Sequence, residues 1–425
     1  MARQCPCPEN RGLRGLRDSR FAIRAPLAYR RAMARVLFLF NHDAPHQVAH
    51  LAGIAAATAR AFPQIECQLA YATDRIEAQV RAILSEDDAA RLAWVRLDLP
   101  AWARVVAKLA DRILPASRLL RLRLNLALFE QADLVMSTER TCLRTKKHLP
   151  ADKTPLYAKV PHGAGDRSVA YHPDYRKFDR AFVAGRKVVD QLVAHGVERE
   201  KVVVIGYPKF ETVDLKAKRD FFGNGRPTFL YNPHFDPHLS SWYDAGPDLL
   251  RWFASPEGQK FNLIFAPHVM LFRKETHVSP EYKLARRRPD VPEEALAAKN
   301  VLVDVDGPHL FDMAYTLSAD AYIGDVSSQV YEFLVRPRPA YFLDCRDKGR
   351  ASDDEWHHFW KSGPVCSSVE ELTGKLEDFE AIGAQYREAQ QELVDYTFDL
   401  QDKPASQRAA EAIGDLLSFS QTAAQ

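Results

Sequence analysis

Three polar residues in the C-terminal half of the chain lie where an apolar strand gives way to a helix. Residues 321–344, AYIGDVSSQVYEFLVRPRPAYFLD, begin with a short apolar run, break at Gly324, and continue with apolar residues at helical spacing. Asp325, Ser327 and Ser328 carry short side-chain oxygens that accept bonds from the first free N–H groups of a helix. Those N–H groups and the helix dipole also favour an anion, the dipole alone by roughly 0.3 to 2 kcal/mol. The pattern therefore indicates a phosphate-binding turn.

Glu332 adds a second polar group to this helix. It follows Ser328 by four positions, so both residues lie on one helix face, about one turn apart. A carboxylate at that distance from a phosphate can accept hydrogen bonds from ribose hydroxyls. A capped turn with a solvated Glu332 explains the same residues without any ligand, and one turn does not establish a nucleotide site.

A candidate base lies in the first half of the chain. The apolar strand 156–160 leads directly into residues 161–165, PHGAG, which place His162 at the strand end beside the small residue Gly163. Imidazole has an ordinary pKa near 6.5 and is the side chain best suited to take a proton from a hydroxyl near neutral pH. A histidine at a strand end is more often structural, and both interpretations stay open on the residues alone.

Further histidines follow other expected strands. Asn41, His42 and His46 come after the first strand, where ligands of doubly wound sheets bind, although they could equally be loop residues. His234 and His268 follow two strands of the second half. Together with Ser327 they predict three strand ends at one edge of the same sheet.

The rest of the chain alternates short apolar runs with helical stretches, which is typical of a parallel α/β sheet covered on both faces. The expected strands are residues 36–40, 67–72, 93–97, 133–136, 156–160, 180–184, 202–205, 228–231, 262–266, 301–305 and 321–323, with a further strand after Pro337 at the end of the stretch 321–344. The expected helices are residues 44–62, 101–113, 118–130, 187–195, 247–253, 309–317, a capped helix from 367 to 379, 386–396 and 406–417.

A length of 425 residues predicts two domains with separate cores. The predicted division is an unstructured or wrongly assigned extension at 1–32, an N-terminal Rossmann-like domain at 33–210, a linker at 211–226, a C-terminal Rossmann-like domain at 227–385, and a helical tail at 386–425.

Charge and composition exclude several classes of protein. The net charge is +2, but residues 1–35 hold nine Arg against Glu9 and Asp18, a balance of +7, so the remaining chain carries 2 − 7 = −5. That balance argues against a nucleic-acid-binding protein, which needs clustered cations on its fold. The six scattered cysteines indicate a cytosolic protein with free thiols, and no apolar run is long enough to span a bilayer.

Residues 101–130 differ from their surroundings. An apolar stripe is formed by Trp102, Val105, Val106, Leu109 and Ile113, and the second helix of the segment mixes leucine with arginine. Basic amphipathic helices of this kind can lie on an anionic membrane surface. A pair of ordinary surface helices is the alternative.

With these residues in place, the chain resembles the CDP-glycerol glycerophosphotransferase family of teichoic-acid polymerases and primases. The most specific block of that family is an Asp-Tyr-Ser-Ser turn after an apolar strand, then a helix, Arg-Pro and a further strand, which here reads ADAYIGDVSSQVYEFLVRPRPAYFLD. The other matching blocks follow in the family's order: His162 with Gly163, the turn 206–208, the strand end from Tyr231 to Pro233, and His268. Three positions depart from the family pattern, namely Ala164 in place of Thr, Val326 in place of Tyr and Glu332 in place of Asp.

The resemblance, which extends over residues 155–415, implies a GT-B-like fold of two Rossmann-like domains facing each other across a cleft, with C-terminal helices. It implies transfer of glycerol phosphate from CDP-glycerol to a hydroxyl of a lipid-linked or polymeric acceptor, with release of CMP. His162 would be the general base, and His268 would stabilise the leaving phosphate. The residues implied to bind the nucleotide and its diphosphate are Gly163, Tyr231, Pro233, Asp325, Ser327, Ser328 and Glu332.

Two other functions use the same features. A GT-B glycosyltransferase with a nucleotide-sugar donor needs the same diphosphate-binding turn, and a non-catalytic protein could keep the fold and dock on membranes. For the transferase we expect no cofactor and no metal, because the histidines lack the close spacing of a zinc site. The expected partners are the nucleotide donor, the acceptor and the inner surface of the cell membrane, with no nucleic acid.

Overall fold

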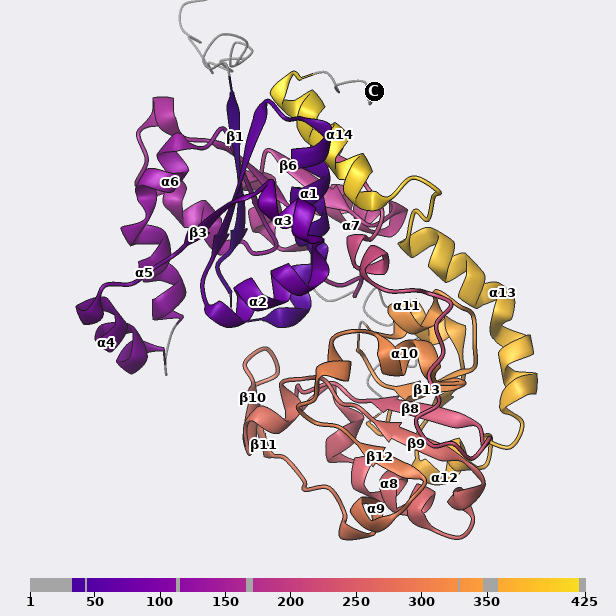
Figure 1. Cartoon of the computed structure of the whole chain (residues 1–425). Helices are drawn as coiled ribbons and strands as arrows, with labels where there is room; N and C mark the ends of the chain where they lie inside the picture. Colours follow the sequence, from indigo (N-terminus) through magenta and orange to yellow (C-terminus); the bar gives the residue numbers. More distant parts are fainter. Residues whose placement is uncertain are drawn as a thin grey trace, which may run out of the picture. The chain divides into compact units, whose positions relative to one another are not determined.

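The chain folds around two parallel β-sheets with helices packed against them (Figure 1). The structure, a computed structural model, describes residues 33–42, 44–111, 115–165, 171–327, 329–346 and 358–419. Both sheets belong to one compact unit of the chain. The predicted α/β class with two parallel sheets is confirmed, whereas the predicted domain boundaries and the extension at 1–32 stay predictions.

The first sheet contains seven strands in the order β3-β2-β1-β4-β5-β6-β7, and every neighbouring pair is parallel. Its strands are β1 (Ala34–Phe40), β2 (Ile65–Tyr71), β3 (Ala93–Arg96), β4 (Leu134–Ser137), β5 (Leu156–Lys159), β6 (Arg180–Val183) and β7 (Val202–Val204). β1 and β4 are buried along almost their whole length, which explains their continuous apolar sequence.

The second sheet has six parallel strands in the order β12-β9-β8-β13-β14-β15. They are β8 (Thr228–Asn232), β9 (Asn262–Phe265), β12 (Val301–Val303), β13 (Ala321–Gly324), β14 (Ala340–Leu343) and β15 (Val365–Cys366). A separate antiparallel hairpin, β10 (Thr276–Ser279) with β11 (Leu284–Arg287), was not predicted, and neither was the two-residue strand β15.

In both sheets the strand order reverses next to the first strand. β1 lies between β2 and β4, and β8 lies between β9 and β13. In open α/β sheets ligands bind outside the carboxyl ends of the strands at this point. Asn41 and Thr138 mark that point in the first sheet, and Pro233 and Asp325 mark it in the second.

The helices cover the sheets. Those associated with the first half are α1 (Ala52–Ala61), α2 (Asp74–Ile83), α3 (Glu86–Ala90), α4 (Ala101–Ala110), α5 (Ala116–Leu124), α6 (Leu126–Gln131) and α7 (Arg186–Ala194). The second half contributes α8 (Gly246–Ala254), α9 (Glu293–Ala297), α10 (Ala314–Ser318), α11 (Gln329–Leu334), α12 (Val369–Thr373), α13 (Phe379–Thr397) and α14 (Ala405–Leu417).

Several predicted helices are divided in the structure. The helix predicted at 44–62 consists of a 3-10 segment, η1 (Pro45–His50), followed by α1, because the backbone leaves helical geometry at Leu51. The helix predicted at 118–130 breaks at Asn125, whose side-chain amide donates to the carbonyl of Arg121. The helix predicted at 309–317 begins only at Ala314, after Met313 with a positive φ of 62°.

The predicted capping box is confirmed, but its helix is short. Ser368 Oγ accepts from the backbone N–H of Glu371, and Glu371 Oε2 accepts from the backbone N–H of Ser367. The helix α12 then ends at Gly374, and the helix predicted at 386–396 is the inner part of the longer α13.

The C-terminal helix α14 returns to the first sheet and packs on α1, as Figure 1 shows. Gly414 of α14 makes close packing possible, because a Cβ added there would lie 2.2 Å from Phe62 Cζ. The start of α14 is held by Glu211, which accepts a bond of 2.8 Å from the backbone N–H of Ser406. The helix before it, α13, lies against both α11 and α7, so the C-terminal helices contact both halves of the chain.

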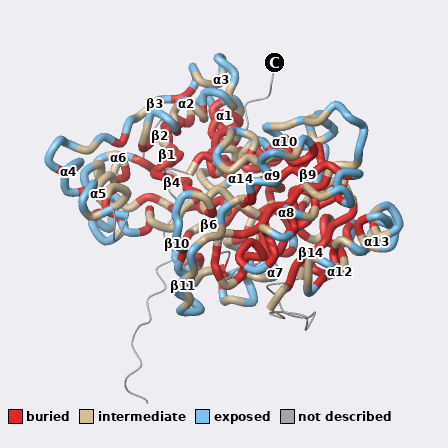
Figure 2. The backbone as a smooth tube through the Cα atoms, turned by 90° about the horizontal axis from the view of Figure 1, so that it is seen from below, coloured by how far each residue is buried: buried red, intermediate tan, exposed pale blue. Residues whose placement is uncertain are grey.

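The cores lie along the sheets, where the tube in Figure 2 is mostly in the colour of buried residues. Among the described residues, Cys67 and Cys142 are buried free thiols. Within the described part of the chain, no helix combines the length and the apolar character needed to cross a membrane.

Candidate functional site

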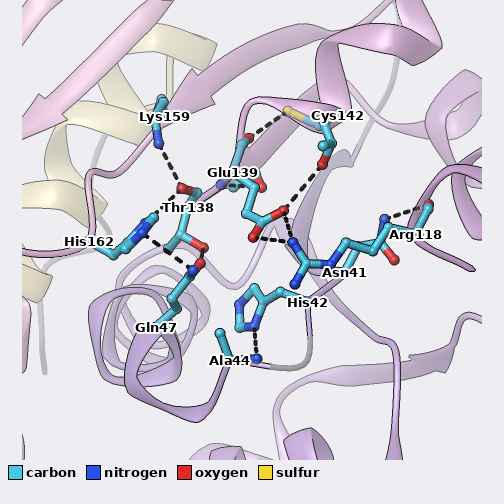
Figure 3. A network of polar contacts seen from close by, with 12 residues as sticks. Asn41, His42, Ala44, Gln47, Arg118, Thr138, Glu139, Cys142, Lys159 and His162 are labelled. Carbon is cyan, nitrogen blue, oxygen red and sulfur yellow. Dashed lines mark hydrogen bonds and ion pairs between the residues drawn. The ribbon is translucent and has the colours of Figure 1, made fainter. Parts of the chain in front are cut away.

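His162 lies at the carboxyl edge of the first sheet, just beyond β5 (Figure 3). The ring is partly buried, and its Nδ1 lies 3.2 Å from the carbonyl oxygen of Thr138, the residue after β4. Its Nε2 lies 3.4 Å from the side-chain nitrogen of Gln47 in η1. Gly163 follows with φ of 87°, a left-handed conformation that glycine adopts without strain. Two strands and the divided helix therefore fix the predicted base.

The surroundings of His162 oppose a positive charge on its ring. Burial is the main reason that the pKa of His162 falls from 6.5 to about 3, and Lys159 and His46 lower it further. Lys159, the last residue of β5, is buried and donates a bond of 2.7 Å to the carbonyl of Thr138. His162 is therefore neutral at pH 7, which is the form that can accept a proton.

Three more histidines border this edge. Burial lowers the pKa of His42 to about 3 and that of His46 to about 4, and it lowers the pKa of His50 well below its ordinary value. The rings of His46 and His162 have centroids 6.0 Å apart. We call His42, His46, His50 and His162 the histidine cluster.

A partly buried ion pair lies beside the cluster. Arg118, from α5, donates to Glu139 at 3.0 and 3.2 Å, and the carbonyl of Arg118 accepts a bond of 3.0 Å from Asn41. This pairing ties α5 to the ends of β1 and β4 (Figure 3). The Glu139 carboxylate offsets the charge of the Arg118 guanidinium.

At the second sheet, Asp325 connects two loops. It is 1% exposed and accepts bonds from the backbone N–H groups of His234 at 3.0 Å and Ser241 at 2.7 Å, and from the Ser241 hydroxyl at 2.9 Å. Burial raises the pKa of Asp325, and the bonds from Ser241, Val326 and His234 oppose that increase. The predicted cap of the following helix thus holds the loop after β8 instead, because its oxygens point across the sheet edge.

His268 lies beside His234 at this edge. Their ring centroids are 5.2 Å apart, and the backbone N–H of His268 donates to the carbonyl of Pro233 at 2.9 Å. His268 Nδ1 accepts from the backbone N–H of Met270 at 3.2 Å, which places the proton of a neutral ring on Nε2. The predicted convergence of His234, His268 and Ser327 at one sheet edge agrees with the strand order.

The remaining predicted nucleotide-binding residues differ in accessibility. Tyr231 is fully buried, and its hydroxyl lies 2.9 Å from Ser241 Oγ, so it supports the loop that Asp325 holds. Ser327 is 2% exposed, and its Oγ accepts from the backbone N–H of Gln329 at 3.4 Å, as expected for a cap. Ser328 lies outside the described residues.

Glu332 does not face solvent. It is 6% exposed, and both of its oxygens accept bonds from Lys209, at 2.7 and 2.9 Å. Tyr207 donates a further bond of 2.8 Å to the same carboxylate. The carboxylate predicted to contact a ribose is therefore occupied by two protein groups from η7 (Pro208–Thr212) and the turn before it.

This ion pair connects the two edges. Lys209 pairs with Glu332 of α11, and its charge lowers the pKa of His46 and His50 in the histidine cluster. Arg273, from the loop after β9, also lowers the pKa of His46. Lys209, which pairs with α11, is thus close enough to the histidine cluster for its charge to act on His46 and His50.

Sequence reasoning did not single out Gln47, Thr138, Lys159 or Lys209. A lysine in the apolar run of β5 is a signal that could have identified Lys159, because a buried lysine is unusual without a specific partner. Gln47 had no such signal, since it lies in a mixed segment predicted as helix. Among the described residues no group of three or more His, Cys, Asp or Glu side chains could hold a metal ion.

Three solved structures with similar folds cover most of the chain. A UDP-N-acetylglucosamine 2-epimerase matches with a TM-score of 0.58 at 12% identity, over 93% of this chain and 99% of that one. MnaA of S. aureus, determined with UDP, matches with a TM-score of 0.57 at 13% identity, over 91% and 98%. A variant of the wall teichoic acid polymerase TagF, soaked with CDPG, matches with a TM-score of 0.54 at 14% identity, over 90% and 88%. These likenesses confirm a GT-B-like fold.

A sequence comparison finds a similar protein family for the second half of the chain. No curated protein sequence matches the chain. Residues 259–415 match the family described as CDP-Glycerol:Poly(glycerophosphate) glycerophosphotransferase, and they contain His268, Ser327 and Glu332. The segment thus includes the turn after β13, which carries the most specific block of the resemblance. Residues 259–415 of the chain are thus similar in sequence to the CDP-glycerol glycerophosphotransferases, a family of transferase enzymes.

Proposed function

We propose that this protein transfers glycerol phosphate from CDP-glycerol to a hydroxyl group of a lipid-linked or polymeric acceptor and releases CMP. The observation that carries the proposal is the orientation of His162, whose Nδ1 faces the Thr138 carbonyl, so that Nε2 is the basic nitrogen. The family domain over residues 259–415 supports the donor class.

The reaction forms one bond and breaks one. The acceptor oxygen attacks the phosphorus that carries the glycerol, and the bond from that phosphorus to the oxygen it shares with the cytidine phosphate breaks. The hydroxyl proton passes to Nε2 of His162, and the electron pair of the broken bond leaves with CMP. A positioned base of this kind is typically worth 10² to 10⁴ in rate.

The low pKa of His162 fits this role when the donor is bound. In the free protein the neutral ring is fully available at pH 7, since its pKa is lowered to about 3. A diphosphate beside the cluster adds negative charge, which stabilises the imidazolium and raises the pKa towards the working pH. The base therefore becomes stronger when the substrate is present.

On the donor side, His268 and Ser327 with Ser328 are proposed to hold the diphosphate. We assign the Nε2–H of His268 as a donor to the leaving phosphate, because Nδ1 accepts from the backbone N–H of Met270. Gly163 lets the backbone approach the ligand closely. Asp325, Pro233 and Tyr231 would shape the loop rather than touch the phosphates, and Glu332 would anchor α11 through Lys209.

A membrane surface is the partner proposed for α4. Trp102, Val105, Val106 and Leu109 are 60, 62, 49 and 66% exposed, whereas Ala103 and Ala107 are buried against the fold. Arg104 and Lys108 are exposed on the same helix. An exposed apolar stripe with adjacent cations fits the interface of an anionic bilayer, where a lipid-linked acceptor would be found.

The test is a donor panel with product identification. Purified full-length protein receives CDP-glycerol or UDP-N-acetylglucosamine, together with a lipid-anchored glycerol phosphate oligomer in vesicles as the acceptor probe. Release of CMP from CDP-glycerol with growth of the oligomer is expected. Release of a nucleoside diphosphate from the sugar nucleotide would overturn the proposal in favour of the glycosyltransferase, which the similar fold of the epimerases makes worth including.

The base assignment has a separate test. His162→Asn should reduce CMP release by about 10² to 10⁴ while leaving donor binding intact, since only the proton acceptor is lost. A His162→Asn protein with a near-normal rate would exclude this residue as the base. Exposed His148 provides the control, because His148→Asn changes a histidine away from the cluster.

A further inference from the structure

Gln47 lies beside His162 of the histidine cluster but has no part in the transfer as described so far (Figure 3). Its Oε1 accepts a bond of 2.8 Å from the hydroxyl of Thr138, and its Nε2 lies 3.4 Å from Nε2 of His162. His162 Nδ1 in turn lies 3.2 Å from the carbonyl oxygen of the same Thr138. The three residues thus form a closed set of polar contacts, one of which is made by the backbone carbonyl of Thr138.

Only one arrangement of protons satisfies all three contacts. The Thr138 hydroxyl donates to Oε1 of Gln47, so the amide NH₂ group of Gln47 faces His162. An amide nitrogen can only donate, which requires His162 Nε2 to be the unprotonated nitrogen. The proton of the neutral ring is then on Nδ1, where the Thr138 carbonyl accepts it.

We propose that Gln47 is a positioning residue for the transfer: it selects the Nδ1–H tautomer of His162 and keeps the lone pair of Nε2 directed at the place where the acceptor hydroxyl enters. This inference rests on the proposed function, because it assigns Nε2 of His162 as the base. Thr138 contacts both other residues: its hydroxyl donates to Gln47, and its carbonyl accepts from Nδ1 of His162.

The contact between Gln47 and His162 is long enough to be replaced when the acceptor hydroxyl binds. A separation of 3.4 Å is longer than the 2.9 to 3.0 Å usual for a nitrogen donor, so the bond is weak. An incoming hydroxyl can therefore take the Nε2 lone pair, and the amide of Gln47 can donate to the hydroxyl oxygen instead. The acceptor gains two partners, while the ring of His162 keeps its bond to Thr138.

Every charged or titratable group that acts on His162 favours the neutral ring. Lys159 on β5, His46 on η1 and His42 after β1 all lower its pKa, and only the bond to the Thr138 carbonyl raises it. His50, also on η1, is close enough to His162 that His162 lowers the pKa of His50. A carboxylate in place of the Gln47 amide would oppose this effect, because it would put an anion beside Nε2.

The tautomer can be tested without turnover. In the full-length protein labelled with ¹⁵N-histidine and free of nucleotide, long-range ¹H–¹⁵N spectra report the protonated nitrogen, and the His162 signals are assigned by their loss in His162→Asn. Gln47→Leu removes the donor at similar length and should convert the single Nδ1–H pattern into a mixture of tautomers. Thr138→Val, which removes only the orienting hydroxyl, should do the same. An unchanged His162 pattern in both variants would overturn the proposal.

Activity supplies the second readout. In Gln47→Leu we expect kcat for CMP release to fall about ten- to a hundredfold with the KM for CDP-glycerol little changed. In Gln47→Glu we expect the acidic limb of the kcat/KM profile to move up by about one pH unit or more, because the carboxylate stabilises the imidazolium. Gln407→Glu, the same change at an exposed site of α14, is the control and should leave both unchanged.

The two proposals fail separately. If CDP-glycerol is turned over and Gln47→Glu shows the wild-type pH profile, the role of Gln47 is overturned while the transfer stands. If the tautomer shifts as expected but no donor of the panel except a sugar nucleotide reacts, the proposed transfer is overturned while Gln47 keeps its effect on His162.

Discussion

At the residue scale, the pair of Lys209 and Glu332 shows how a buried charge can join two parts of the fold. Their side chains are only 9 and 7% exposed, and both carboxylate oxygens are bonded to the ammonium. Such a pair adds little net stability compared with apolar residues of the same size, but removing one partner leaves an uncompensated charge. Unlike a surface ion pair, this pair therefore makes each partner necessary once the other is present.

We expect Lys209→Met to lower the free energy of unfolding by about 3 to 5 kcal/mol, because the Glu332 carboxylate stays buried without its cation. Lys209→Met with Glu332→Leu should recover much of that loss. Urea denaturation of the wild type and the two variants measures both. Equal losses in the single and the double variant would show that the pair is not the reason.

At the element scale, α4 presents its apolar residues outwards. The helix packs through its alanines, so its large side chains contribute nothing to the core. Such a surface has an energetic cost in water that is recovered only when a partner covers it.

The double variant Val105→Ser with Leu109→Ser should bind vesicles of anionic lipid at least roughly tenfold more weakly. Burial of each aliphatic side chain in the bilayer contributes about 1.5 to 3 kcal/mol of binding free energy. The thermal stability should not change, since both residues are exposed. The matched control replaces Leu296 and Leu400, which are 61 and 50% exposed on other elements. Sedimentation with vesicles decides: equal binding by both double variants would count against a membrane role for α4.

The contact between α1 and α14 is the second feature at this scale. It contains two glycines in different surroundings: a Cβ on Gly414 would lie 2.2 Å from Phe62 Cζ, whereas a Cβ on Gly53 would lie 3.7 Å from Ser406 Cβ. Alanine at either site improves helix propensity by up to about 1 kcal/mol. Only at Gly414 must a neighbouring ring move.

Gly414→Ala is therefore expected to destabilise the protein by about 1 to 3 kcal/mol, the usual cost of overpacking, while Gly53→Ala is neutral or slightly stabilising. Thermal unfolding of both variants provides the measurement. The opposite order of melting temperatures would mean that α14 does not pack on α1 as described.

At the scale of the whole molecule, the histidine cluster makes stability depend on pH. The pKa values of His42, His46 and His162 are about 3, 4 and 3 in the folded protein, mainly because of burial, and His50 follows the same direction. In the unfolded chain the same groups take up protons near pH 6.5. Below that pH the unfolded state binds more protons, so stability is present above about 6.5 and is lost as the pH falls.

We expect the free energy of unfolding to fall between pH 6.5 and 4 by up to about 1.4 kcal/mol per pH unit for each buried histidine. Replacing fully buried His42 by Asn should reduce that slope by about one proton, whereas His148→Asn at an exposed site should not. Urea denaturation at several pH values measures the slope. A slope that does not change in His42→Asn would show that this ring is already protonated or exposed.

Much of the architecture could be predicted from local patterns. Continuous apolar runs predicted the main strands, because a strand buried on both faces needs no polar alternation, and the Ser368–Glu371 capping box fixed the start of α12. The short elements were harder: β15 has two residues, and the hairpin β10–β11 has a mixed polar sequence, so neither carries a clear period. The divided helix at η1 and α1 also has no sequence signal strong enough to mark Leu51.

By itself the sequence determined the two parallel sheets, the strand ends that carry His162, His268 and Ser327, and the apolar spacing along α4, because each depends on neighbours within one segment. Only the tertiary structure decided the partners of those residues. Glu332 is held by Lys209, Asp325 holds a loop of another strand, and Gln47 meets His162 across 115 positions. Burial and charge act through space, so a side chain's partners and pKa are fixed only when distant strands are brought to one edge.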